Sequence, residues 1–120
     1  MLTPATLTTE ASLSESIRFT GVFWMERRDW DMLHPHFADR ENFPSTYEQW
    51  RPLAQHALKV LSKDGLQAIK VRADPKEFLR WCGAKGFSID VQARLEYANE
   101  QAATQWSRQH KLVMDLQGQT

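Results

Sequence analysis

The sequence has little capacity for disulfide or thiol chemistry, because Cys82 is the one cysteine among its 120 residues. A single cysteine excludes an intrachain disulfide and any zinc site built from several thiolates. A chain of this length forms one hydrophobic core without such cross-links. Because a lone free thiol is typical of a reducing compartment, we predict a cytoplasmic protein.

Long apolar runs and an excess of one charge are also missing. No run approaches the roughly 20 apolar residues that span a bilayer, and residues 1–16 lack the basic start and apolar centre of a signal peptide. Fifteen basic residues balance fifteen acidic ones. No overall field therefore attracts nucleic acid or an anionic membrane, and we predict a protein without membrane contact.

Local motifs of common enzyme classes are absent as well. The chain has no glycine-rich phosphate loop, no nucleophile elbow and no His-Glu-x-x-His helix. We therefore predict no catalytic residue, no cofactor and no metal site. An enzyme with an acid/base pair scattered along the chain remains an alternative, because carboxylates far apart in sequence leave no local pattern.

The clearest pattern that is present starts in the second half of the chain, where residues 65–74 predict a strand. Ile69 and Val71 alternate with charged residues, which indicates one buried face and one wet face. The strand stops at Asp74, whose carboxylate suits a helix N-cap. Pro75 suits the first helical position, and Glu77 completes a capping box.

Two helices follow this strand. The first carries the apolar stripe Phe78, Leu79, Trp81 and Cys82 and ends near Gly83 or Gly86, which suit a left-handed exit. Ser88 or Asp90 caps the second. Its predicted buried face consists of Val91, Leu95, Ala98, Ala102 and Trp106. The runs 77–82 and 93–98 resemble segments of small bacterial proteins, a likeness that implies no activity and no site residue.

The first half of the chain supplies the other strand. Residues 1–15 are rich in Thr and Ser and predict a flexible N-terminal arm. Residues 17–25 alternate, with Phe19 and Phe23 on one side and Trp24 on the other, which favours a strand. This strand should pair with the one around Ile69, because a lone strand leaves its backbone unpaired. The sequence does not decide between parallel and antiparallel pairing.

Two helical segments lie between the strands. Trp30, Leu33 and Phe37 recur at helical spacing, but Pro35 should bend or end that helix early. The next helix should begin at a Ser-x-x-Glu capping box, residues 45–48, and kink at Pro52. Its predicted buried positions are Trp50, Leu53 or Ala54, Ala57 and Leu61.

These elements predict an α+β fold in the order β-α-α-β-α-α, with helices packed on a two-stranded sheet. The globular domain should span residues 16–116, and residues 117–120 should fray.

Asp29, Asp31, His34 and His36 fall within eight residues, and their side chains are of the types that bind zinc. On a helix, residues two apart point in nearly opposite directions. Only an extended turn forced by Pro35 could aim both histidines at one ion, so solvated loop histidines are the favoured interpretation. Cys82 is likewise interpreted as a core residue rather than a nucleophile, because it lies near a helix C-terminus on the apolar stripe.

A degenerate helix-turn-helix is the alternative that would make the protein a small nucleic-acid-binding regulator. Gly86 supplies the turn glycine between the last two helices. Gln92, however, occupies a position that should be apolar. The presumed recognition helix sets Glu96 and Glu100 against Arg94, a poor balance for a surface that faces phosphates.

The unusual abundance is that of tryptophan, with five residues. Tryptophan is enriched at protein interfaces, and five indoles crowd the core of a chain this small. We predict a non-enzymatic binding or assembly module with an aromatic surface, acting on a protein partner or as a homodimer. The predicted contact residues are Trp24, Trp30, Trp50 and Trp106, and Trp24 should be the most exposed because it lies opposite Phe19 and Phe23.

Overall fold

The computed structural model describes the backbone of residues 18–118 and the side chains of residues 18–109. The predicted arm, residues 1–15, lies outside the described part. The predicted order β-α-α-β-α-α and the α+β class are confirmed. The elements are β1 (Phe19–Trp24), α2 (Arg27–Leu33), two 3₁₀ turns (His34–His36 and Arg40–Asn42), α3 (Tyr47–Lys63), β2 (Gln67–Arg72), α4 (Pro75–Lys85) and α5 (Val91–Gly118).

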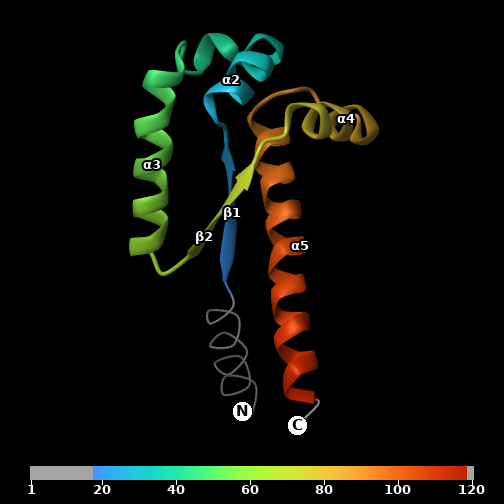
Figure 1. The fold of residues 1–120 in the computed structure, drawn as a ribbon. Helices are drawn as coiled ribbons and strands as arrows, with labels where there is room; N and C mark the ends of the chain where they lie inside the picture. Colours follow the sequence, from blue (N-terminus) through green and yellow to red (C-terminus); the bar gives the residue numbers. More distant parts are fainter. Residues whose placement is uncertain (1–17, 119–120) are drawn as a thin grey trace, which may run out of the picture.

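The two strands pair in parallel, from Phe19 opposite Gln67 to Trp24 opposite Arg72. Parallel strands need a long crossover, which residues 25–66 provide with α2 and α3. α3 lies on one side of the sheet and α5 on the other (Figure 1). The chain is therefore long enough to cover both faces of its sheet with helices.

α5 approaches β1 closely at Gly21, the small residue in the middle of the strand. A side-chain carbon at this position would lie well under 3.0 Å from the backbone of Ala98. The Gly21 N–H donates to Asn99 Oδ1 at 2.9 Å. Glycine therefore lets a helix backbone rest directly on a strand backbone.

The buried face of α5 differs from the predicted one. Val91 and Leu95 are 56% and 52% exposed, so their assignment to the core is wrong. Ala98 and Ala102 are buried as predicted, and Trp106 is half-buried. The core receives Ala93, Arg94 and Tyr97 in place of Val91 and Leu95, so α5 is rotated relative to the predicted face.

The boundaries of α2 and α3 follow from proline and capping. α2 ends at Leu33, just before Pro35, as predicted. α3 begins one residue later than predicted, since Thr46 is the N-cap and its hydroxyl accepts from the Gln49 N–H at 3.2 Å. Gln49 reaches back to the Ser45 N–H at 3.1 Å. The Ser-x-x-Glu box predicted at residues 45–48 is therefore wrong by one position.

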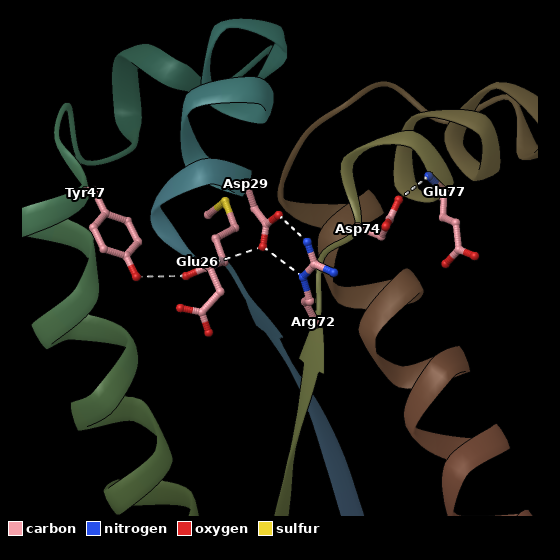
Figure 2. Close-up of polar contacts among 7 residues, drawn as sticks. Glu26, Asp29, Tyr47, Arg72, Asp74 and Glu77 are labelled. Carbon is pink, nitrogen blue, oxygen red and sulfur yellow. Dashed lines mark hydrogen bonds and ion pairs between the residues drawn. The ribbon is translucent and has the colours of Figure 1, made fainter.

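α4 begins and ends at the residues that the sequence indicated. Asp74 Oδ1 accepts from the Glu77 N–H at 3.0 Å (Figure 2), and Pro75 occupies the first turn. The Asp74 N–H donates to Arg72 O at 3.2 Å, so the return bond from Glu77 that a capping box needs does not form. The helix exits through Gly86 at φ 74° in the left-handed region.

Replacing Asp74 with alanine should lower the free energy of unfolding by about 1 kcal/mol, because the Glu77 N–H loses its acceptor while Pro75 still presets the turn. Chemical denaturation measures this as a lower midpoint with an unchanged slope. Asp74→Ser is the matched control and should retain most of the stability. Equal midpoints for Asp74→Ala and the wild type would show that the cap contributes nothing.

Candidate functional site

Polar side chains of the described residues line several hollows, and two of these lie between different elements of the fold. The first is at the carboxyl ends of β1 and β2, where many α/β proteins bind ligands (Figure 2). A shallow pocket of about 330 Å³ opens there. Its walls are formed by Arg28, Asp29, Met32, Arg72, Asp74, Pro75 and Lys76.

Asp29 is the central group of this strand-end cluster and is fully buried. Arg72 donates to both of its oxygens, from Nη2 to Oδ1 at 2.9 Å and from Nε to Oδ2 at 3.3 Å (Figure 2). The Glu26 N–H also donates to Asp29 Oδ2, at 3.0 Å. The hydrogen bond from Arg72 to Asp29 raises the pKa of the Arg72 guanidinium.

The strand-end cluster holds the fold together rather than offering free groups. The Asp29 and Arg72 pair joins the start of α2 to the end of β2, and the Tyr47 hydroxyl donates to Met25 O at 3.1 Å from α3. No buried side-chain nitrogen or oxygen in the described part of the chain lacks a partner. Both oxygens of Asp29 therefore accept hydrogen bonds that join elements of the fold.

The side chains of the four candidate metal ligands lie in different environments. Asp29 pairs with Arg72, and His34 stacks on Trp30 and contacts Pro44 O through Nε2 at 3.1 Å. Asp31 and His36 are exposed. Within residues 18–109 no three His, Cys, Asp or Glu side chains lie close enough to hold one ion.

Three of the four tryptophans predicted to contact a partner are buried. Trp24, Trp30 and Trp50 are 4%, 6% and 8% exposed. They pack together, with Trp24 5.5 Å and Trp30 6.1 Å from Trp50 between ring centroids. The predicted exposure of Trp24 is wrong because α3 covers the face of the sheet that was expected to be open. Trp106 is half-buried and stacks on Phe19 at 5.4 Å.

A second hollow lies between α4 and the first turns of α5, which are adjacent in Figure 1. We call it the α4–α5 groove. It measures about 350 Å³ and is lined by Glu77, Arg80, Trp81, Ala84, Tyr97 and Gln101. The sequence placed Trp81 only on the apolar stripe of α4 and gave no signal for Tyr97, whose position depends on how α5 is rotated.

Aromatic packing fixes the floor of the groove. Trp81 stacks on Phe87 with centroids 5.3 Å apart and meets the edge of Tyr97 at 5.4 Å. Phe78 packs beneath, 5.1 Å from Tyr97. The Trp81 Nε1–H donates to Glu100 Oε2 at 3.2 Å. The indole is thus held in one orientation while part of it stays accessible.

Tyr97 brings a polar group into this aromatic floor. Tyr97 is 3% exposed, and its hydroxyl has no hydrogen-bond partner among the described residues. Because every enclosed polar side-chain atom there is partnered, this hydroxyl is not fully enclosed, and Tyr97 is one of the residues that line the groove. Burial, with the charges of Glu77 and Asp74, raises the pKa of Tyr97 to about 12.

Cys82 lies on the buried side of α4 and is 2% exposed, as predicted. Burial, with a smaller contribution from the Asp90 carboxylate, raises the pKa of its thiol. We therefore expect a thiol reagent to label the native protein far more slowly than the denatured protein, since the thiolate is the reactive form. Following both reactions by absorbance tests this, and equal rates would contradict it.

Arg94 is the basic residue that the nucleic-acid interpretation assigns to the presumed recognition helix. Arg94 of α5 is 6% exposed and binds Asp39 through two hydrogen bonds, at 3.0 and 2.6 Å. Glu96 and Glu100 are exposed on the same helix. Along residues 91–107 of the presumed recognition helix, the exposed charges are therefore acidic, which is unfavourable next to phosphates.

Exposed aliphatic side chains form one further stripe, along α3. Leu53 and Val60 are 60% and 41% exposed, and Ala57 between them is also exposed. Their spacing of four and three residues puts them on one side of the helix. We call these residues the α3 stripe.

No family model, curated protein or solved structure matches the chain. Among the described residues, no helix is both long and apolar enough to cross a membrane.

Proposed function

We propose that the protein is a cytoplasmic, non-enzymatic binding module that contacts a protein partner through the α4–α5 groove. The observation that carries the proposal is the Trp81 indole, which lines the groove, stays partly exposed and is held in one orientation by ring packing and by its hydrogen bond to Glu100. Aromatic residues with a polar tip are typical of interface contact points. The aromatic surface inferred from the tryptophan content is therefore assigned to Trp81, which is partly exposed, rather than to Trp24, which is buried.

Site-specific photo-crosslinking in the native cell tests this assignment. A photoreactive residue at Ala84, which is exposed and lines the groove, should give one defined protein adduct. The matched control is the same residue at Gln55, which is exposed on α3. The adduct should disappear when Trp81→Ala is added. Identical adducts at both positions, or none at Ala84, would overturn the proposal.

Self-association is a second candidate function, favoured by the α3 stripe. Two copies of α3 packed antiparallel would bury Leu53 against Val60 of the partner, with the small Ala57 near the two-fold axis. Light scattering during size exclusion should then show a dimer that Leu53→Glu converts to a monomer. Leu95→Glu, at a similarly exposed leucine of α5, should leave the mass unchanged. A monomeric wild type would exclude this candidate.

A further inference from the structure

A cation of the chain itself lies beside the α4–α5 groove, against the Trp81 side chain that lines it. Lys85 Nζ lies 3.7 Å from Glu100 Oε2 and 6.0 Å from the centroid of the Trp81 ring. The same Glu100 oxygen accepts from the Trp81 indole N–H. Carboxylate and indole together thus form a place where an ammonium group is stable.

This internal contact is weak enough to exchange. The Lys85 and Glu100 side chains are 51% and 49% exposed. Exposed ion pairs contribute at most about 1 kcal/mol, and a cation 6.0 Å from a ring centroid lies at the outer limit of cation–π attraction. Another ammonium group of suitable reach competes with Lys85 at little cost.

The rest of the groove suits the remaining parts of a lysine side chain. Trp81 and Ala84 offer apolar surface to a four-carbon stem. Glu77 adds a second carboxylate, and the charges of Glu77, Asp74 and Glu100 all act on Tyr97. The Tyr97 hydroxyl stays neutral at physiological pH, so its oxygen accepts a hydrogen bond from an ammonium group. Arg80, the one basic residue of the lining, is exposed.

We infer that the α4–α5 groove receives a lysine side chain of a partner protein, whose ammonium group displaces Lys85 from Glu100 and Trp81. The inference rests on the proposed function, since it names the chemistry of the residue that the groove contacts. The groove volume of about 350 Å³ is near the lower end of ligand pockets, roughly 300–1,000 Å³, and fits a side chain better than a nucleotide.

Nuclear magnetic resonance titration of the full chain tests the inference with three small probes. N-acetyl-lysine methylamide carries the ammonium group, and N-acetyl-norleucine methylamide has a similar stem without it. N-acetyl-arginine methylamide carries a guanidinium group instead. The lysine probe should shift the Trp81 indole N–H signal and bind about threefold to fivefold more tightly than norleucine, because the ring and the carboxylates attract the charge.

Two variants separate the contacts. Lys85→Gln removes the internal competitor and should tighten lysine binding without changing norleucine binding. Tyr97→Phe removes only the hydroxyl and should weaken lysine binding by about threefold to tenfold. Equal binding of lysine and norleucine, tighter binding of arginine, or no shift with the lysine probe would each overturn the inference. The photo-crosslinked adduct at Ala84 does not depend on these titrations. A negative titration would therefore overturn the inference about lysine and leave the proposed function intact.

Discussion

Gly21→Ala should remove the folded state or lower its free energy of unfolding by about 3 kcal/mol or more. The added methyl group would overlap the backbone oxygen of Ala98, and a main-chain atom cannot rotate away as a flexible side chain does. α5 would have to move off β1. It would then lose the hydrogen bond from the Gly21 N–H to Asn99 and the packing of Tyr97 on Phe23.

Thermal and chemical denaturation followed by circular dichroism measure this effect. Gly83→Ala is the matched control, because no atom lies within 4 Å of a side-chain carbon built at Gly83 inside α4. In a helix interior, alanine is favoured over glycine by roughly 1 kcal/mol, so this control should be neutral or stabilising. A Gly21→Ala protein with the wild-type midpoint would show that α5 does not rest on β1 at this position.

Asp39→Ala should have the second largest effect and lower the free energy of unfolding by about 3 kcal/mol or more, because it leaves the buried Arg94 guanidinium without its ion-pair partner. Arg94 is 6% exposed and lies 4.5 Å from the ring centroids of both Phe37 and Phe43. Neither ring replaces the two hydrogen bonds that Asp39 accepts. The matched control is Arg27→Ala, which breaks the surface ion pair with Glu48 and should cost no more than about 1 kcal/mol.

The acid dependence of stability gives an independent measure of the same pair. The hydrogen bond from Arg94 holds the pKa of Asp39 below its usual value. A carboxyl whose folded pKa is lowered stabilises the fold above its unfolded pKa, about 4, and loses that contribution as the pH falls through the folded pKa. The gap in stability between the wild type and Asp39→Asn should therefore narrow below about pH 4. A gap that is constant with pH would contradict the role of this charge.

Features that depend on neighbouring residues could be predicted from the sequence. The cap at Asp74, the proline after it and the exit at Gly86 are set within one turn of chain, and the structure has all three. Pro35 ends α2 for the same reason, because a proline ring acts on the residues next to it.

Features that depend on distant residues could not be predicted in this way. The rotation of α5 is set by Gly21, far back in the chain, and without that contact the spacing of Val91 and Leu95 fits a buried face equally well. The cover over Trp24 comes from α3, and the groove at Tyr97 exists only because α4 and α5 are adjacent. No local pattern records these contacts.

The parallel pairing of β1 and β2 has a consequence for the order of folding. Neither strand has its hydrogen-bonded neighbour until residues 25–66 have closed into a loop, and closing a loop of that length is entropically costly. The contacts of β2, α4 and α5 span much shorter separations and form without that closure. We therefore expect residues such as Phe78 to be structured in the folding transition state. Gly21 should pack against α5 only after the transition state.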